Sequence, residues 1–191
     1  DALPIWHAAQ GEVIREWKGD YLVLLRRFDS DGNGELDDYL EQLEGLVGPL
    51  RAEDRPWIVQ HAAIAEPEQI SRLAALDLDL TTTMSFSWGK GELFADRVGE
   101  AILEHLVPLQ RFLNAGLTVG CGTDWGPKNV FEHLALAAKP RYGASGRAAA
   151  TAGVSRIDAL ATWTRTAAQV LRWNDIGSLV AGHHADMIVV D

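Results

Sequence analysis

Short apolar runs alternate with segments of helical periodicity from residue 56 onward, and this alternation leaves few possible folds. Three runs have the length and the β-forming residues of buried strands: 57–61 (WIVQH), 78–83 and 117–121. Four segments between and after them carry apolar residues at the spacing of one helical face: 67–76, 108–116, 129–138 and 155–171. Strands and helices in this order predict right-handed βαβ units and a parallel sheet.

Local signals mark the ends of several of these segments. Pro67 and Pro108 suit the first turn of a helix, and Gly116 suits the end of one. Ser155 and Asp158 have the spacing of a capping box, which predicts that the last helix opens there. Residues 187–190 are predicted to form the last strand.

Chain length limits how much of a parallel fold can be present. A complete (β/α)₈ barrel takes about 250 residues, whereas this chain has 191, which fits one domain with about four βα units. We therefore predict an α/β fold that corresponds to the C-terminal half of a (β/α)₈ TIM-like barrel, with a small open α/β sheet as the alternative. A half-barrel leaves sheet edges unpaired, so we also expect homo-oligomers or association through those edges.

Charge and residue types exclude several functions. The chain has 17 basic and 27 acidic residues and a formal net charge of -10, which argues against nucleic-acid binding. A single cysteine, Cys121, excludes an internal disulfide and a Cys-rich zinc knuckle. No apolar run reaches the roughly 20 residues of a membrane span. The first residues show no signal peptide, so the cytoplasm is the expected compartment, although the chain begins without methionine, as a piece of a longer protein does.

Two polar residues end predicted strands at the edge where parallel α/β folds carry their chemistry. His61 closes the run 57–61, and Asp124 follows the run 117–121. An imidazole and a carboxylate at one barrel mouth suit a divalent metal that activates water, and the aspartate can act as general base. The alternatives are a structural histidine, and an aspartate that caps a helix or holds the turn at Gly126. Spacing alone does not decide between these interpretations.

Four ordered segments carry a resemblance that covers roughly the last seven-tenths of the chain. Residues 57–62 (WIVQHA) resemble the R-W-x-I-x-H-A strand of the amidohydrolase superfamily, in the branch that includes N-substituted formamide deformylases, and residues 67–70 continue that pattern. Residues 108–125, with GCGTDW at their end, are similar to the P-L…A-G…G-S-D-W-P segment. Residues 176–186 (IGSLVAGHHAD) resemble the I-G-S-L-x-x-G-K-x-A-D signature that closes the barrel.

The resemblance implies both a fold and an activity. Residues 1–182 would be strands five to eight of a distorted metal-dependent hydrolase barrel, and residues 183–191 the first strand of a truncated β-sandwich. The family hydrolyses amide or other non-peptide C–N bonds of small molecules with one or two divalent metals, commonly zinc. His61 would be the metal-binding histidine of strand six, and Asp124 the strand-eight aspartate that touches metal and moves the proton.

The same resemblance implies that the ligand set is incomplete. The His-x-His of strand one and the ligand of strand four would lie upstream of residue 1. A catalytic zinc needs three protein ligands plus water. We therefore expect this chain to be inactive alone. A non-catalytic module with a degenerate metal site is the alternative function.

Residues 29–40 are open to three interpretations. Asp29, Asp31 and Asn33 occupy the first ligand positions of an EF-hand calcium loop, but Leu40 stands where a bidentate glutamate should close it. By the resemblance, residues 21–27 would be strand five, and Asp29 would replace its metal-binding histidine. The apolar face of the helix that follows would then be formed by Leu36, Leu40, Leu43 and Val47. A plain Asx-rich turn is the third possibility.

The remaining candidates concern substrate binding. Trp88 and Trp125 are expected on strand-end loops facing a substrate, and Arg141 is a candidate substrate contact after strand eight. The pair 183–184 (HH) occupies a turn in the family pattern and is predicted to be structural, because adjacent residues on an extended chain point to opposite faces. Cys121 is predicted to be buried and inert.

Overall fold

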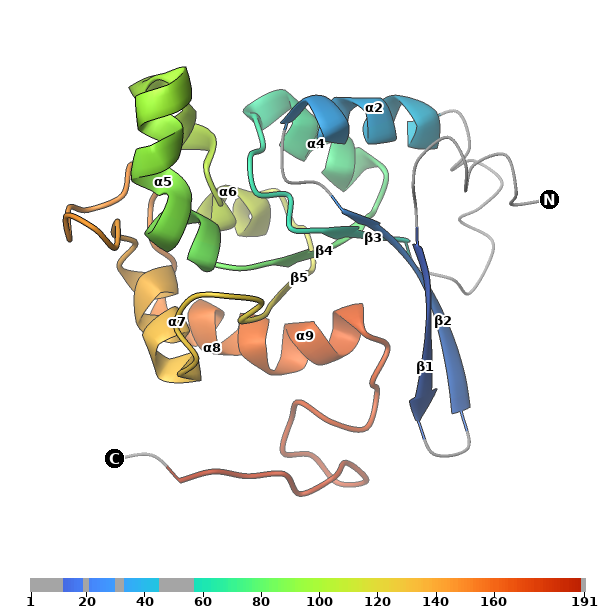
Figure 1. The fold of residues 1–191 in the computed structure, drawn as a ribbon. Helices are drawn as coiled ribbons and strands as arrows, with labels where there is room; N and C mark the ends of the chain where they lie inside the picture. Colours follow the sequence, from blue (N-terminus) through green and yellow to red (C-terminus); the bar gives the residue numbers. More distant parts are fainter. Residues whose placement is uncertain (1–11, 19–20, 30–32, 45–56, 190–191) are drawn as a thin grey trace.

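The computed structural model describes residues 12–18, 21–29, 33–44 and 57–189 (Figure 1). The strands are β1 (Glu12–Lys18), β2 (Tyr21–Asp29), β3 (Trp57–Gln60), β4 (Asp79–Thr82) and β5 (Val119–Cys121). The helices are α2 (Asn33–Glu44), α4 (Pro67–Ala75), α5 (Ser85–Val98), the 3-10 helix η1 (Glu100–His105), α6 (Leu109–Asn114), α7 (Val130–Ala138), α8 (Arg156–Trp163) and α9 (Arg165–Val170).

The strands form one five-stranded sheet in the order β1-β2-β3-β4-β5. β2 to β5 are parallel, as the alternation of strands and helices predicts, with Asp29 opposite Gln60, Gln60 opposite Thr81 and Thr81 opposite Gly120. β1 pairs antiparallel with β2, and this strand was not predicted. The α/β class with a small parallel sheet is therefore confirmed.

The two faces of the parallel part carry different neighbours. One face carries Val59, Leu80 and Val119, which lie opposite one another on neighbouring strands. These residues belong to the main core together with residues of α2 and α4. Ile58 lies on the other face, where it packs against Val170 and Leu171 of the α9 region. Figure 1 shows α2 and α4 on one side of the sheet and α9 on the opposite side.

This placement of α9 bears on the predicted half-barrel. The helices of a complete barrel form an outer ring around the sheet. Here α9 also covers the opposite face, since a Cβ on Gly120 would lie 3.1 Å from the backbone of Ala167, and Arg172 pairs with Asp79 at 2.7 Å. The half-barrel detail is therefore not confirmed.

Local chemistry explains where the helices begin. Pro67 is the first residue of α4, where the Gln69 side chain accepts from the Glu66 N–H at 2.8 Å. Ser155 caps α8 by accepting from the Asp158 N–H at 3.1 Å, as the capping-box spacing predicts. The end of α6 before Gly116, with its positive φ of 81°, is also confirmed.

The segment 155–171 is not one helix. Thr164, at φ -125° and ψ -94°, leaves the helical region and separates α8 from α9. The Thr164 hydroxyl donates to the carbonyl of Leu160 at 2.9 Å, and that of Thr166 lies 2.8 Å from the carbonyl of Val119. Threonine hydroxyls that bond to nearby carbonyls compete with helical hydrogen bonding. The contact between Thr166 and Val119 places a hydroxyl donor at the edge of β5 that does not face β4.

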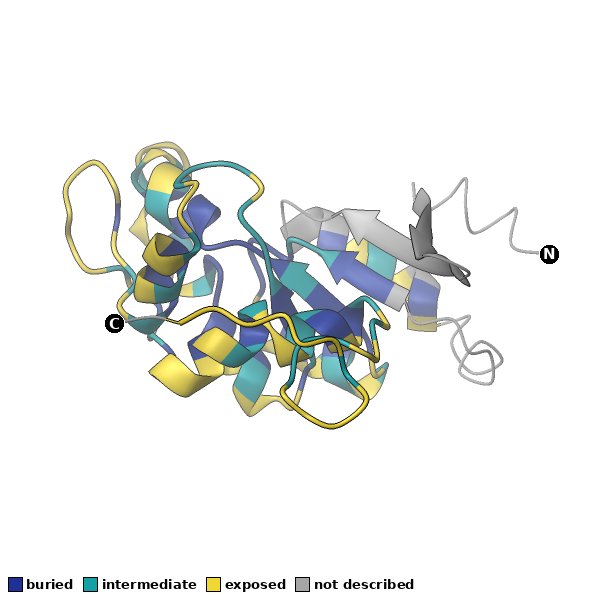
Figure 2. Cartoon of the chain, turned by 90° about the horizontal axis from the view of Figure 1, so that it is seen from below, coloured by how far each residue is buried: buried dark blue, intermediate teal, exposed yellow. Residues whose placement is uncertain are grey.

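The predicted last strand is wrong over residues 187–189, which have no strand conformation. Ile188 and Val189 are 77% and 96% exposed, and Figure 2 shows this segment along the surface. A strand requires a neighbour for its hydrogen bonds, and residues 187–189 pair with none of the described strands. The division into a barrel (1–182) and a sandwich strand (183–191) stays a prediction.

Candidate functional site

His61 and Asp124 emerge from the carboxyl ends of two parallel strands. His61 follows β3 directly, and Asp124 follows β5 after a short turn. Both residues have positive φ, 68° and 44°, which is uncommon outside glycine and costs of order 1–3 kcal/mol. The backbone therefore leaves the strand conformation at these two points and turns both side chains toward the same edge of the sheet.

The two side chains meet. Nε2 of His61 lies 3.4 Å from Oδ2 of Asp124, with the histidine side chain 12% exposed and the aspartate 48% exposed. Gln60 Nε2 lies 3.1 Å from the same histidine nitrogen and donates to it when the ring proton is on Nδ1. Sequence reasoning brought His61 and Asp124 to one cavity, and the structure places them there. Their roles in metal binding and catalysis stay predictions.

A cavity of about 230 Å³ opens beside this pair. It is lined by the ends of β3, β4 and β5 and by α9, through Gln60, His61, Thr81, Thr82, Thr83, Gly120, Cys121, Gly122, Asp124, Ala167 and Leu171. Burial raises the pKa of the Cys121 thiol to about 11, so this thiol stays protonated near neutral pH. Cys121 has intermediate exposure in the cavity wall, so its predicted full burial is not confirmed, whereas the protonated thiol agrees with the predicted low reactivity.

The donors at this edge fit part of a zinc site. An imidazole nitrogen and a carboxylate oxygen are both zinc ligands, and a catalytic site needs three protein ligands. The described residues contain no group of three histidine, cysteine, aspartate or glutamate side chains that could hold a metal. Asp29 ends β2 opposite Gln60, so its backbone lies at the same edge as His61, although its side chain is outside the described part.

The calcium interpretation of residues 29–40 gains no support. An EF-hand loop connects two helices, whereas here β2 runs through Asp29 and α2 begins at Asn33, inside the proposed loop. Asp31 lies outside the described residues. The strand-five interpretation agrees better with the fold, because its predicted helix face is buried at Leu36, Leu40 and Leu43. Val47 lies outside the described residues.

Two buried hydroxyls hold the turn that carries Asp124, and sequence reasoning missed both. Ser85 Oγ donates to the carbonyl of Trp125, and Thr83 Oγ1 lies 3.4 Å from the carbonyl of Thr123 and 3.0 Å from Ser85 Oγ. Each hydroxyl has one proton, so two donors serve the carbonyls on either side of Asp124. Nothing local in the sequence identifies these contacts, because each joins residues about 40 positions apart.

A histidine anchors the far end of the same loop. His133 is fully buried in α7, and its Nε2 lies 2.8 Å from the carbonyl of Pro127. Its ring also lies against Trp163 at a centroid distance of 5.4 Å. This histidine therefore packs in the core.

Aromatic rings continue the site beyond His61. The Phe86 ring meets the His61 ring edge-on at 5.1 Å, and the Trp125 ring meets Phe86 edge-on at 5.7 Å. The Lys90 ammonium lies over both Phe86 and Trp125, at 4.9 Å and 5.0 Å from their centroids. Trp125 thus occupies the strand-end turn where it was predicted. Phe86 and Lys90 were not predicted.

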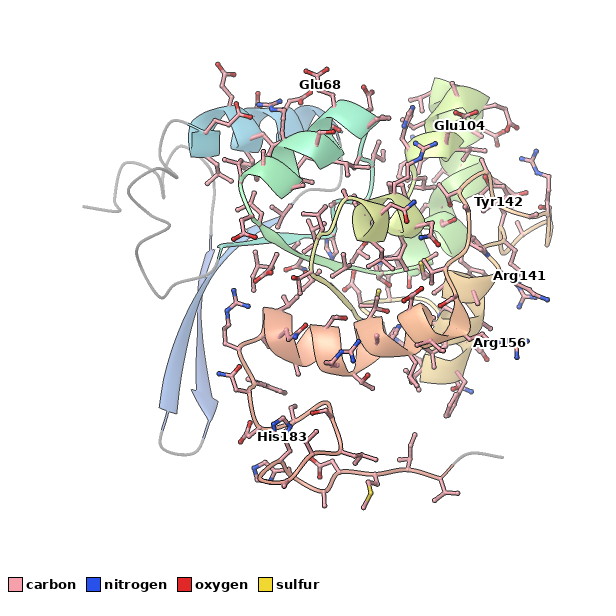
Figure 3. All side chains as sticks on the ribbon, turned by 180° about the vertical axis from the view of Figure 1, so that it is seen from behind. Glu68, Glu104, Arg141, Tyr142, Arg156 and His183 are labelled. Atoms are coloured by element: carbon pink, nitrogen blue, oxygen red, sulfur yellow. The ribbon has the colours of Figure 1, made fainter. Side chains whose placement is uncertain are left out.

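The strand-end loop predicted for Trp88 is wrong, and the substrate contacts of Trp88 and Arg141 stay predictions. Trp88 belongs to α5, not to a strand-end loop, because that helix begins at Ser85, soon after β4. Its indole packs so closely on Gly143 that a Cβ there would come within 2.7 Å of the ring. Arg141 is exposed, and Figure 3 shows it at the periphery of the molecule. Neither residue lines the cavity.

The paired histidines near the C-terminus make local contacts. His183 Nδ1 lies 3.0 Å from the Ser178 hydroxyl, and His184 Nε2 lies 3.2 Å from the Asp175 carboxylate. The two rings thus have separate partners, as predicted for a structural turn.

Helices of membrane-spanning length and hydropathy are absent from the part of the chain that the structure describes.

Comparison with known proteins places this geometry in a family. The profile of the amidohydrolase family matches residues 27–191. The N-substituted formamide deformylase of Arthrobacter pascens is 31% identical over 169 residues, which are 84% of this chain and 30% of that protein. The chain thus spans about a third of the length of its curated relative.

Solved structures of metal-dependent hydrolases share the fold. An uncharacterized metal-dependent hydrolase from Pyrococcus horikoshii matches 83% of this chain and 32% of its own, with a TM-score of 0.67 and 20% identity. A second one, from Pyrococcus furiosus, matches 83% of this chain and 31% of its own, with a TM-score of 0.64 and 24% identity. Because the family profile spans most of the sequence and the deformylase is similar along most of it, the chain belongs to the amidohydrolase family.

Proposed function

We propose that this chain is the His61 and Asp124 portion of a longer metal-dependent hydrolase that cleaves amide or other non-peptide C–N bonds of small molecules. The observation that carries the proposal is the 3.4 Å approach of His61 Nε2 to Asp124 Oδ2 at the shared carboxyl edge of a parallel sheet. The deformylase relative makes N-substituted formamides the first substrates to test.

In this proposal His61, Asp124 and Asp29 bind metal, and Asp124 also transfers a proton. A divalent metal, zinc by the chemistry of the donors, would polarise the amide carbonyl and increase the acidity of water. His61 and Asp124 would hold it, and Asp29 is the candidate for a third ligand because β2 ends beside Gln60. Asp124, the more exposed of the two, would take a proton from the attacking water and return it to the leaving amine.

The parallel strands β2 to β5 would be strands five to eight of a barrel in the longer protein. Their order and register, and the likeness to about a third of each Pyrococcus hydrolase, support this proposal. The face that carries Ile58 and Gly120 would then point into the barrel, and α9 would repack when further strands close it. Alone, the chain would lack ligands and be inactive.

The test is a comparison of matched variants in the full-length protein. His61→Ala and Asp124→Asn should each lower the hydrolysis of an N-substituted formamide by at least about 100-fold. They should also lower the bound zinc measured by mass spectrometry. His183→Ala, in the C-terminal turn, and Asp96→Asn, on the exposed side of α5, remove the same chemical groups outside the site and should change neither readout. Full activity in both site variants would refute the proposal.

A non-catalytic module with a degenerate metal site is the second candidate. This candidate is favoured because the described residues bring together two potential metal ligands, His61 and Asp124, whereas a catalytic zinc site needs three. This candidate predicts that the full-length protein hydrolyses no formamide and holds no zinc after dialysis.

A further inference from the structure

The Lys90 ammonium occupies an unusual position for a cation near a candidate active site. It lies 4.9 Å from the Phe86 centroid and 5.0 Å from the Trp125 centroid. Phe86 touches the His61 ring, and Trp125 is the next residue after Asp124. Lys90 therefore lies one ring away from His61 and over the ring of the residue that follows Asp124.

No carboxylate neutralises this cation within the described part of the chain. Arg72, Arg147 and Arg172 all have acidic partners there, whereas Lys90 has only the two rings. Cation–π contacts hold an ammonium in place without cancelling its charge. The half-buried Lys90 thus retains donors for an anion, in a chain whose formal net charge is -10.

The rings also fix the position of the charge. Phe86 is 2% exposed and makes edge contacts with both His61 and Trp125. Gly89 leaves room for the indole of Trp125, because a Cβ there would lie 2.6 Å from the ring. A glycine beside Lys90 therefore lets Trp125 pack against α5 and under the ammonium. The geometry is built from residues of α5 and of the turn that carries Asp124.

We infer that Lys90 binds the carboxylate of an anionic substrate whose scissile amide lies at His61 and Asp124. This inference rests on the proposed hydrolase function and names its substrate class: amides that carry a carboxylate beyond an apolar stretch able to pack against the partly exposed Trp125. Lys90 is a specificity-determining residue in this account, since it contacts the end of the substrate that does not react.

The experiment uses the zinc-loaded full-length protein and paired substrates of identical skeleton. One series is N-formyl ω-amino acids of increasing chain length, and the other is the corresponding carboxamides. The native enzyme should prefer one carboxylate length over its carboxamide, mainly through KM. Lys90→Met replaces the ammonium with an uncharged side chain of similar length. It should reduce that preference by a factor of about 10 to 100, the range of a charge-assisted hydrogen bond. Lys90→Arg should retain most of it.

Lys139→Met is the matched control, because Lys139 is exposed at the end of α7 and, among the described residues, has no cation–π contact with Phe86 or Trp125. It should leave the preference unchanged. Equal preference in native protein and Lys90→Met, or the same loss in both methionine variants, would overturn the inference.

Binding to metal-free protein separates this inference from the proposed function. In titration calorimetry with the preferred N-formyl ω-amino acid, the Kd for Lys90→Met should be at least about 10-fold higher than the Kd for native protein. This difference is expected whether or not the formamide is cleaved. If no formamide is hydrolysed but this difference is present, the proposed function fails and the anion site stands. If the native protein binds the acid no better than its carboxamide, the anion site fails.

Discussion

Replacing Ser85 with alanine removes the hydroxyl that holds the Asp124 turn. Ser85 is fully buried, and its Oγ donates to the carbonyl of Trp125. The Thr83 hydroxyl is left to serve Thr123, so the partly buried carbonyl of Trp125 loses its donor. Leaving such an acceptor unsatisfied costs about 1–3 kcal/mol. A loss of about 2 kcal/mol raises the unfolded fraction about 30-fold and lowers Tm by about 4–8 °C for a domain of this size.

Ser87 provides the matched control in the same helix. It is 2% exposed, and its hydroxyl has no hydrogen-bond partner in the described structure. Ser87→Ala should therefore leave the urea midpoint unchanged or raise it, whereas Ser85→Ala should lower it, as followed by circular dichroism. In the full-length protein Ser85→Ala should also lower kcat about 10-fold or more with KM nearly unchanged, because a small displacement of a catalytic group is costly. Equal midpoints for the two variants would refute the role of Ser85.

Three further predictions concern packing, pH and thiol reactivity. Gly153→Ala should destabilise the fold by about 1–3 kcal/mol in urea unfolding, because a Cβ there would lie 2.2 Å from the carbonyl of Ala138, whereas Gly122→Ala meets nothing within 4 Å and should be tolerated. Burial raises the pKa of Asp79 above its usual value despite the Arg172 partner, so the folded state keeps this proton longer than the unfolded chain. The Asp79 contribution to stability is therefore full below about pH 4 and falls as pH rises toward the folded pKa. The stability difference between native protein and Asp79→Asn should change with pH across this window, and a constant difference would contradict the burial argument. Because the pKa of Cys121 is about 11, a disulfide reagent at pH 8 should modify it slowly in native protein and rapidly in urea, and equal rates would show that the thiol is accessible.

Sequence periodicity was sufficient for the parallel part of the fold. The strand run 117–121 and the helix 67–76 appear as β5 and α4, because their apolar spacing and Pro67 are local signals. β1 carries β-forming residues and is followed by Gly-Asp before β2, a hairpin signal that the prediction did not use. The break at Thr164 was missed because its neighbour Thr166 contacts Val119, a residue far away in the sequence. The position of α9 on the second face likewise depends on Ile58, which no local pattern connects to Val170.

The candidate site divides in a similar way. That His61 and Asp124 lie together followed from their positions at the ends of parallel strands, a rule that holds for any such sheet. The rule does not say which residues hold the turn or surround the pair. Ser85 and Lys90 follow β4 on α5, and their contacts with the Asp124 turn join segments that are distant in the sequence. Trp88 was misplaced because β4 passes into α5 with almost no loop.

Anomalous X-ray diffraction from crystals of the zinc-loaded full-length protein tests the central claim most directly. The account predicts a zinc peak about 2.0–2.2 Å from both His61 Nε2 and an Asp124 carboxylate oxygen. A zinc ion bound elsewhere, with His61 and Asp124 paired only to each other, would contradict it.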